Sequence, residues 1–422
     1  MHMKKLFALV LALLMLLGTV SGCGAKEDEQ PVDDGTAEIY IYQDKYEIDA
    51  ALKAACDAYT ALNPNVTFVV ESTSSDQFST QLKTMFASGQ GPDIFSTKGS
   101  EDLAIMVEYM ENLDAQTWVA NMSAAAVEAG SYEGSVYGFP IAEESYGYVY
   151  NKDLFAQAGI TDVPKTLTEL RAVCEKLVEA GITPFSSNYS EWYQSGMFKF
   201  SSAISRQDDP LAFIAALNDG SATMVGNEEI INLAKWIDIE IEYSKSPLNA
   251  DFNTQVADFA NGTCAMMLGG SWSQPALDDA NPGMNVGLFP LPMSEDATES
   301  KLFTSSAPFW SVNNASEDKE EALAFLEWLS TDPEGQKYLS SEFALIPAFT
   351  NIAVDSVAIG PLGADTTTYI AAGETYGIYS SFFPQGMGGA QLFGETVNKY
   401  AAGLLSVDEF AAELQAQWES VS

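Results

Sequence analysis

The sequence predicts an α/β fold built on a mostly parallel, doubly wound sheet, because strand and helix signals alternate from residue 38 onward. Residues 38–43 (EIYIYQ), 66–71 (VTFVVE) and 93–96 (DIFS) have the composition of strands. Between them, apolar side chains recur at helical spacing over residues 52–59 and 78–86. This order makes the two helices crossover connections between parallel strands.

Capping signals mark later helices. Thr166 with Glu169, and Ser406 with Glu409, have the spacing of a capping box. Aromatic side chains that lie on helical apolar stripes are assigned to the core. They are Tyr59, Phe78, Phe86, Phe325 and Trp418.

Composition excludes several classes of function. The chain has 422 residues, with 59 acidic and 19 basic side chains and a net charge of −40, so it lacks the basic surface that nucleic acids or anionic lipids require. Hydrophobic residues make up 47%, which is enough for a large core, and the length suggests two domains or one unusually large one. The single histidine, His2, falls in a leader that we expect to be removed. Histidine-dependent nucleophiles, general bases and zinc sites are therefore excluded.

The N-terminus has the pattern of a secretory leader. Lys4 and Lys5 precede an apolar run over residues 6–17, which is too short to span a membrane comfortably. Residues 20–23 (VSGC) resemble the bacterial lipobox, in which the cysteine is lipidated and becomes the first mature residue. We therefore expect a signal peptide over residues 1–22 and a lipidated Cys23; the alternative is an ordinary leader with an incidental cysteine.

Residues 23–37 are expected to form a flexible tether, since they are acidic and lack an apolar period. The protein is then extracytoplasmic and held to the cell membrane by its lipid anchor alone.

The other cysteines do not form a disulfide framework, because only Cys56, Cys174 and Cys264 follow Cys23. Cys56 and Cys174 lie on apolar helix faces and are interpreted as buried small hydrophobic residues. The absence of a CxxC pair argues against a zinc site, and we expect neither a metal nor a cofactor.

Several segments occur in the order found in one known family. They are residues 63–66 (NPNV) with 91–95 (GPDIF), 136–140 (VYGFP), 148–155 (YVYNKDLF), 259–272 (FANGT to GGSW), 322–329 and 344–348 (ALIPA). Together they resemble the family 1 extracellular solute-binding proteins of ABC importers, the maltodextrin-binding group.

The resemblance implies a two-lobe, periplasmic-binding-protein-like fold of type II, with hinge crossings between the lobes. It places residues 38–143 and 302–345 in the N-terminal lobe, and residues 147–300 and 350–422 in the C-terminal lobe. It also implies a monomer that binds a sugar in the cleft between the lobes and delivers it to ABC permease subunits.

A sugar site needs aromatic faces for the apolar side of a ring and polar groups for its hydroxyls. On the first lobe, the resemblance and the strand ends point to Gln43, Asp44 and Lys45, to Asp76 before the second helix, and to Lys98 after the third strand. The alternatives are a solvated turn for the first group and an N-cap role for Asp76.

Further candidates lie at the first crossing and in the second lobe. Glu144 matches a sugar-contacting glutamate of the family, with Tyr146 beside it, although Glu144 and its neighbour could form a hydrated surface pair. Trp192 and Tyr193 stand in a polar loop, where packing is the alternative. Trp272 is the strongest candidate, because a flexible Gly-Gly-Ser turn would let its ring project from a strand end.

The remaining candidates lie near the second crossing and in a glycine-rich loop. Of Phe309 and Trp310, one is expected to line the cleft and the other to pack below it. Phe383, Gln385 and Met387 belong to a loop before a helix, where backbone N–H groups could face ligand oxygens.

Two other functions remain open from the residues alone. A surface glycoside hydrolase would use two carboxylates about 5–10 Å apart, although the sequence has no glycosidase motif. A binding protein for another solute, such as a cation held by Asp44, Asp76 and Glu144 in an aromatic cage, is the second alternative. Sugar capture without catalysis is the favoured interpretation.

Overall fold

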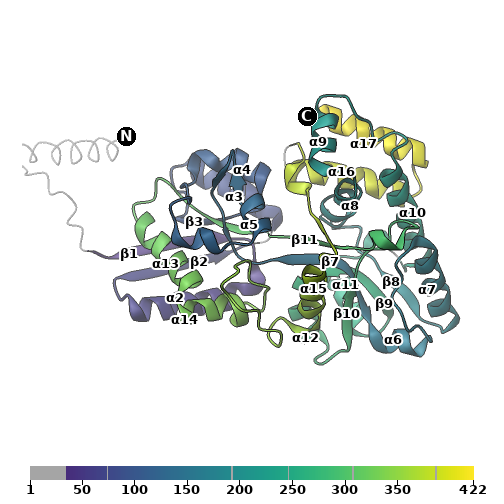
Figure 1. Ribbon diagram of the computed structural model, residues 1–422, viewed down its shortest axis with the longest axis horizontal. Coiled ribbons are helices and arrows are strands. Elements are labelled where there is room, and N and C mark those ends of the chain that lie inside the picture. The colour runs from purple at the N-terminus through teal and green to yellow at the C-terminus, as the bar shows by residue number, and fades with distance from the viewer. Residues whose placement is uncertain (1–34, 74, 192, 246, 307, 385–386) are drawn as a thin grey trace, which may run out of the picture. The chain divides into compact units, whose positions relative to one another are not determined.

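The computed structural model describes residues 35–422, apart from residues 74, 192, 246, 307 and 385–386. Two separate mixed sheets organise Ala37–Ser422, and helices flank both sheets (Figure 1). We call the part built on the sheet that contains β1 the first lobe and the part built on the sheet that contains β7 the second lobe.

The sheet of the first lobe has the strand order β2-β1-β3-β12-β6. Strands β1, β2 and β3 are parallel, whereas β12 is antiparallel to both β3 and β6. The strands are β1 (Ala37–Gln43), β2 (Val66–Ser72), β3 (Ile94–Thr97), β6 (Phe139–Pro140) and β12 (Phe309–Val312). The helices of this lobe are α2 (Asp49–Leu62), α3 (Ser75–Ala87), α4 (Ser100–Met106), α5 (Ala124–Ala129), α13 (Lys319–Thr331) and α14 (Pro333–Lys337).

The sheet of the second lobe has the order β13-β11-β7-β9-β8, and β10 also pairs with β7. Along one edge of β7, β11 pairs with its beginning and β10 with its end, while β9 covers the other edge. The strands are β7 (Glu144–Asn151), β8 (Thr183–Ser186), β9 (Cys264–Gly270), β10 (Val286–Phe289), β11 (Leu302–Ser305) and β13 (Thr375–Gly377).

The helices of the second lobe include long amphipathic helices and one π-helical segment, η4. They are α6 (Lys152–Gln157), α7 (Leu167–Glu179), η4 (Tyr193–Phe200), α8 (Ser201–Ser205), α9 (Pro210–Asn218), α10 (Glu228–Tyr243), α11 (Phe252–Ala260), α12 (Gln274–Ala280), α15 (Gly360–Ala372), α16 (Met387–Ala401) and α17 (Val407–Val421).

Short elements complete the chain. The hairpin is β4 (Ser131–Tyr132) with β5 (Ser135–Val136), and η8 (Tyr338–Glu342) is a second π-helical turn. The 3₁₀ turns are η1 (Tyr46–Ile48), η2 (Val107–Tyr109), η3 (Thr117–Asn121), η5 (Pro247–Asn249), η6 (Ser271–Ser273), η7 (Ala297–Glu299) and η9 (Ser380–Phe382).

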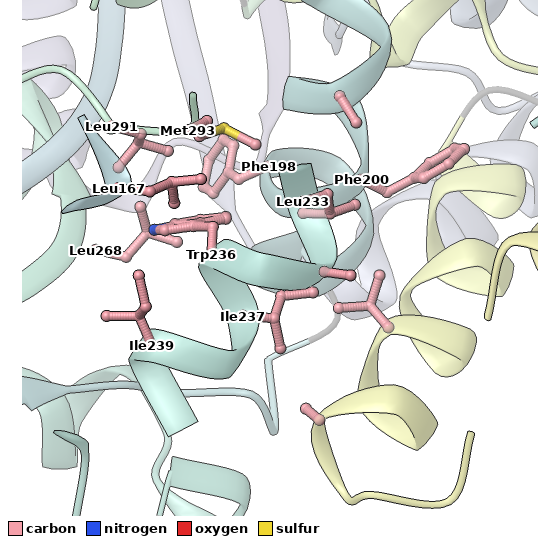
Figure 2. Packing of buried hydrophobic residues seen from close by; sticks show 14 of the residues in the cluster. Leu167, Phe198, Phe200, Leu233, Trp236, Ile237, Ile239, Leu268, Leu291 and Met293 are labelled. Atoms are coloured by element: carbon pink, nitrogen blue, oxygen red, sulfur yellow. The ribbon is translucent and has the colours of Figure 1, made fainter. Parts of the chain in front are cut away.

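Each lobe has its own hydrophobic core. In the second lobe, Trp236 of α10 is fully buried among apolar side chains that include Leu167 and Leu268, with Phe198 and Phe200 of η4 nearby (Figure 2). In the first lobe, α2 and α13 pack Tyr59 against Phe325 with ring centroids 5.3 Å apart. The five aromatic residues assigned to the core from the sequence are all buried.

The predicted elements are largely confirmed. The three strands and two helices expected over residues 38–96 are β1, α2, β2, α3 and β3, and the mixed α/β class is correct. Ser406 and Glu409 form the expected reciprocal capping box. Thr166 accepts from Glu169 N, but the Glu169 carboxylate accepts from Lys165 N rather than from Thr166 N.

Two predictions about the sheets are wrong in detail. The sheets are mixed rather than mostly parallel, because β7 is antiparallel to each of its three neighbours. Leu302–Ser305, expected in the first lobe, form β11 and pair with β7 and β13 of the second sheet. Conversely, Ile346 bridges to Glu143 and Phe349 to Met122, so the first-lobe segment continues beyond residue 345.

Three further observations concern the described residues only. Among them, no helix is both long enough and apolar enough to cross a membrane. Nor do these residues contain a cluster of three or more histidine, cysteine or acidic side chains arranged to hold a metal ion. Cys56, Cys174 and Cys264 are free and buried, and burial raises the pKa of each thiol, that of Cys264 to about 12.

We expect Cys56, Cys174 and Cys264 to resist alkylation in the folded protein. Reaction requires both opening of the structure and thiolate formation, so iodoacetamide should label them at least about 100-fold more slowly than in urea. Peptide mass spectrometry after timed labelling measures each site. Native labelling at the unfolded rate would contradict the burial of that cysteine.

Candidate functional site

The buried side chain of Gln43 links the end of β1 to the neighbouring strands. It is fully buried, and its amide donates to Ser72 Oγ at 3.1 Å, while its Oε1 accepts from Trp310 Nε1 at 3.4 Å. Gln43 thus joins the ends of β1 and β2 to β12. It supports the carboxyl edge of the sheet from inside, and Asp44 and Lys45, which follow it, are buried as well, with 6% and 4% exposure.

Charged residues follow the ends of β1 and β3, where parallel strands present their carboxyl ends on one edge. Lys98 Nζ lies 2.5 Å from Asp44 Oδ2. Burial opposes the charge on Lys98, but the Asp44 carboxylate outweighs it, and the pKa of Lys98 is raised. Burial also raises the pKa of Asp102 on α4, although the Lys98 charge lowers it.

A second ion-paired group connects this edge to the first crossing. Lys45 Nζ lies 2.6 Å from Glu144 Oε1 and 2.7 Å from Glu47 Oε1, with only 4% of the lysine side chain exposed. Burial opposes the Lys45 charge, but the two carboxylates outweigh it and raise its pKa. Burial also raises the pKa of Glu144, and Lys45 offsets this only in part. We call Asp44, Lys45, Glu47, Lys98, Asp102 and Glu144 the charged edge.

The charged edge meets the second lobe where β7 begins and β9 ends. Ser145 N, next to Glu144, donates to Ser271 Oγ at 3.3 Å, and Ser271 precedes Trp272. A Cβ atom on Gly270 would lie 2.0 Å from Ser145 O and 2.2 Å from Cζ3 of the Trp272 indole. Only glycine allows this approach, so a backbone contact holds Glu144 and Trp272 near each other.

The role of this glycine differs from the expected one. Gly270 has an extended backbone, with φ −154°, at the end of β9. The residue is therefore required because strand and indole leave no space for a side chain, and not because the turn is flexible.

Aromatic rings gather beside Trp272. Its half-buried indole stacks on Phe198 of η4 with centroids 5.2 Å apart and an interplanar angle of 22°. Tyr193, also half-buried, approaches the same phenylalanine edge-on, with centroids 5.9 Å apart. Phe198 is buried beneath both. We call Tyr193, Phe198 and Trp272 the ring platform.

Four aromatic candidates lie in the core instead of at a surface. Tyr146, Phe309, Trp310 and Phe383 all have 0% exposure. The Tyr146 ring stacks on Phe303, and its hydroxyl donates to Phe198 O at 3.0 Å. Because neither Phe309 nor Trp310 reaches the surface, the expectation that one of them lines a cleft is not met. These four residues leave our candidate site as ligand contacts.

The other predicted residues are only partly covered by the structure. Cys23, Trp192 and Gln385 lie outside the described residues. Asp76 falls in the first turn of α3 and Met387 at the start of α16, but their side chains are not described.

The structure adds residues that the sequence interpretation did not single out. Glu47 and Asp102 complete the charged edge, and Phe198 supports the ring platform. Tyr46 is 62% exposed directly after Lys45, and burial followed by the charge of Glu47 raises its pKa. The position of Tyr46 and Glu47 immediately after the predicted first strand was an available signal. The sequence around Phe198 gave no such signal, because a phenylalanine that only packs in the core would have the same neighbours in the sequence.

Comparison with known proteins identifies the class. The sequence pattern of the family described as "Bacterial extracellular solute-binding protein" matches residues 44–336. The match covers more than half of the chain. The chain belongs to this family.

Individual relatives agree with this class. The maltotriose-binding protein of Pyrococcus abyssi is 26% identical over 77% of this chain and 70% of its own length. The multiple sugar-binding protein of Streptococcus mutans is 24% identical over 78% of this chain and 80% of its own length. Among solved structures, RafE in complex with raffinose superposes with a TM-score of 0.78 at 20% identity, covering 92% of this chain and 100% of that chain. This last likeness establishes the two-lobe fold.

Replacing Lys45 should leave two carboxylates in a partly buried site without their cation. We expect Lys45→Met to lower the free energy of unfolding by about 3 kcal/mol at pH 7. As the pH is lowered from 7 the loss should shrink, because Glu144, whose pKa is raised by burial and rises further without Lys45, takes up a proton more readily. Urea denaturation at a series of pH values from 7 downward measures the effect.

The matched control is Lys53→Met, which removes an exposed partner of Asp49. It should cost less than about 0.5 kcal/mol at any of these pH values. Equal losses for the two variants, or a loss that grows on acidification, would contradict the role given to Lys45.

We expect Gly270→Ala to displace the Trp272 indole, because the added methyl group overlaps both Ser145 O and the ring. Overpacking of this kind should cost about 2 kcal/mol and shift the tryptophan fluorescence emission. Gly262→Ala is the control: it strains a turn with φ +70° before β9 but meets no atom within 4 Å. An unchanged emission spectrum in Gly270→Ala would show that the ring is not held by this contact.

Proposed function

We propose that this protein is an extracytoplasmic lipoprotein that captures a sugar between its two lobes and delivers it to an ABC permease. Closure of the lobes around the ligand would shift the population from open to closed, and the permease would recognise the closed form. The chain acts by reversible binding, and no bond of the sugar is broken.

The ring platform is the observation on which this proposal rests. A sugar ring has an apolar C–H face that packs well on an indole, and Trp272 presents a half-buried ring already braced by Phe198. Glu144 lies at the adjacent strand end and retains 16% exposure, so its carboxylate can accept from sugar hydroxyls. The Ser145–Gly270 contact joins the backbone next to Glu144 to the backbone that leads to Trp272.

The ion pairs of the charged edge favour a neutral ligand. Lys98 already binds Asp44, and Lys45 already binds Glu144. A cationic solute would have to compete with these internal ammonium groups for the same carboxylates. The structure therefore supports the sugar over the cationic alternative, in spite of the net charge of −40.

The relatives support an oligosaccharide. Proteins named for binding maltotriose and multiple sugars are the relatives described above, and the similar RafE structure contains raffinose. Several rings would use more than one aromatic surface. The exposed Tyr46 is a second one, and it stands in the chain between Lys45 and Glu47 of the charged edge.

The anchor and the partners follow from the same proposal. We propose that residues 1–22 are removed, that Cys23 carries the lipid and that residues 23–37 tether the protein to the membrane. A relative from Streptococcus pneumoniae is named as a maltooligosaccharide solute-binding lipoprotein, which supports this arrangement. The protein would act as a monomer that contacts the permease subunits.

Removal of the Trp272 indole should weaken sugar binding without unfolding the protein. We expect Trp272→Ala to raise the Kd for the bound sugar at least about tenfold, equivalent to about 1.4 kcal/mol, with the fold retained. A calorimetric titration series with maltotriose, raffinose, stachyose and chitooligosaccharides identifies the ligand first and then measures the variant.

Tyr243→Ala is the matched control, since Tyr243 is a half-buried aromatic residue of the same lobe that contacts Arg171 instead of the ring platform. It should leave the Kd unchanged. If polyamines, titrated in the same way, were the only solutes that released heat, the cationic alternative would be favoured. New reducing ends in the oligosaccharide after incubation with the protein would favour a hydrolase.

A further inference from the structure

The second lobe contains an ion pair that is sealed inside its core. Lys199 Nζ of η4 lies 2.9 Å from Glu240 Oε2 of α10, and the two side chains are 1% and 0% exposed. In the described part of the chain no other ion pair has both partners so inaccessible. The pair lies in the same core as Trp236, with Phe198 and Phe200 on the adjoining π-helical segment (Figure 2).

Glu240 collects hydrogen bonds from three elements. Its Oε1 accepts from the Tyr148 hydroxyl of β7 at 2.8 Å, and its Oε2 accepts from the Tyr189 hydroxyl at 2.8 Å as well as from Lys199. The Lys199 ammonium also lies over the rings of Tyr189 and Trp236, at 4.5 and 4.9 Å from their centroids. Both carboxylate oxygens are therefore engaged.

The two partners that share Oε2 stand at opposite ends of one segment. Tyr189 lies before η4 and Lys199 near its end, and the segment between them contains Tyr193 and Phe198. Phe198 stacks on Trp272 of η6, and Tyr193 packs edge-on against Phe198. One buried carboxylate thus fixes both ends of the segment that carries these rings.

Stability alone does not explain a charge pair at this position. Desolvation of two buried charges largely cancels their attraction, and apolar residues of similar size are often at least as stable. A π-helical segment is rare in proteins and is frequently found at functional sites. A directional anchor at each end gives such a segment one defined position.

We propose that Lys199 and Glu240 are positioning residues of the sugar site, which hold the segment between Tyr189 and Lys199 so that Phe198 and Tyr193 brace the Trp272 indole. This inference rests on the proposed function for the identity of the ligand, but the positioning itself is a property of the ligand-free protein.

The first test uses Lys199→Met without ligand. Hydrogen–deuterium exchange should rise at least tenfold in peptides covering residues 189–200, with little change in the first lobe. In protein labelled with 5-fluorotryptophan, the ¹⁹F resonance of Trp272, assigned through Trp272→Phe, should shift or broaden. Native exchange together with an unchanged Trp272 resonance would overturn the proposal.

Glu229→Gln is the matched control. It weakens the buried Arg206–Glu229 pair of the same lobe, in which Arg206 is 2% exposed, and the described hydrogen bonds of Glu229 go to Arg206 and Asn227 instead of to the segment. Its melting temperature should fall, while exchange over residues 189–200 stays native. An equal increase in exchange for both variants would mean that loss of stability, and not loss of the anchor, loosens the segment.

Ligand binding is then measured with maltotriose and raffinose. Lys199→Met should weaken binding of whichever sugar the wild-type protein binds by about tenfold, and Glu229→Gln should not. If the wild-type protein binds neither of these nor any other sugar, the proposed function fails while the ligand-free comparison still decides the positioning role.

If Lys199→Met does not fold, Lys199→Met combined with Glu240→Gln removes both charges together and carries the same comparison. We expect this double variant to fold with a loosened segment. Native-like exchange and a native Trp272 resonance in it would overturn the proposal.

Discussion

The cost of removing charge from water is the constraint on which the arrangement of the candidate site depends. A buried ammonium or carboxylate is tolerated only where partners replace its hydration. The chain has only 19 basic residues for 59 acidic ones, yet it uses Lys45, Lys98 and Lys199 at buried or nearly buried positions. Each of these lysines binds a carboxylate from a different element. Buried ion pairs therefore connect one element to another in this protein. The excess of acidic side chains remains at the surface, where water hydrates the charges.

Strand β7 connects these ion pairs to one another. Its first residue, Glu144, binds Lys45 of the first lobe. Its second, Ser145, contacts Gly270 of β9 and Ser271 of η6, and Tyr148 donates to the buried Glu240. A strand paired along both edges cannot shift one of these contacts without shifting the others. The charged edge, the Trp272 indole and the core ion pair are consequently fixed relative to the same strand. Glu144 belongs to the first crossing and is also the first residue of β7. A change in the position of Lys45 would therefore displace Glu144 and, with it, the strand that supports the ring platform.

How far the sequence could predict this arrangement depended on the range of the interactions. Periodicity and capping are local, and they correctly placed β1 to β3, the helix stripes and the Ser406 cap. Position after a strand end selected Asp44, Lys45 and Lys98, whereas Glu144 was selected through the family resemblance. Position near the expected second crossing failed for Phe309 and Trp310, because a strand covered on both faces buries both side-chain directions, and alternation then does not reveal a surface. Gly270 is required because of Ser145, which lies 125 positions away in the sequence, and Glu240 acts on residues that lie 41 or more positions away. No local sequence pattern encodes contacts over such separations.

The distribution of charge also explains how a strongly acidic protein can bind a neutral ligand. Long-range attraction from surface carboxylates is screened over about 8–10 Å at ordinary ionic strength, so the net charge does not determine what the site prefers. What matters locally is that three carboxylates of the charged edge, Asp44, Glu47 and Glu144, are already ion-paired with lysines. An ion-paired carboxylate remains a good acceptor for hydroxyl groups but no longer offers an uncompensated charge to a cation. Placed beside an indole that is braced from below, such acceptors suit a ligand that has many hydroxyls and no charge of its own. The lysines at the strand ends would thus set the specificity of the site as much as its stability.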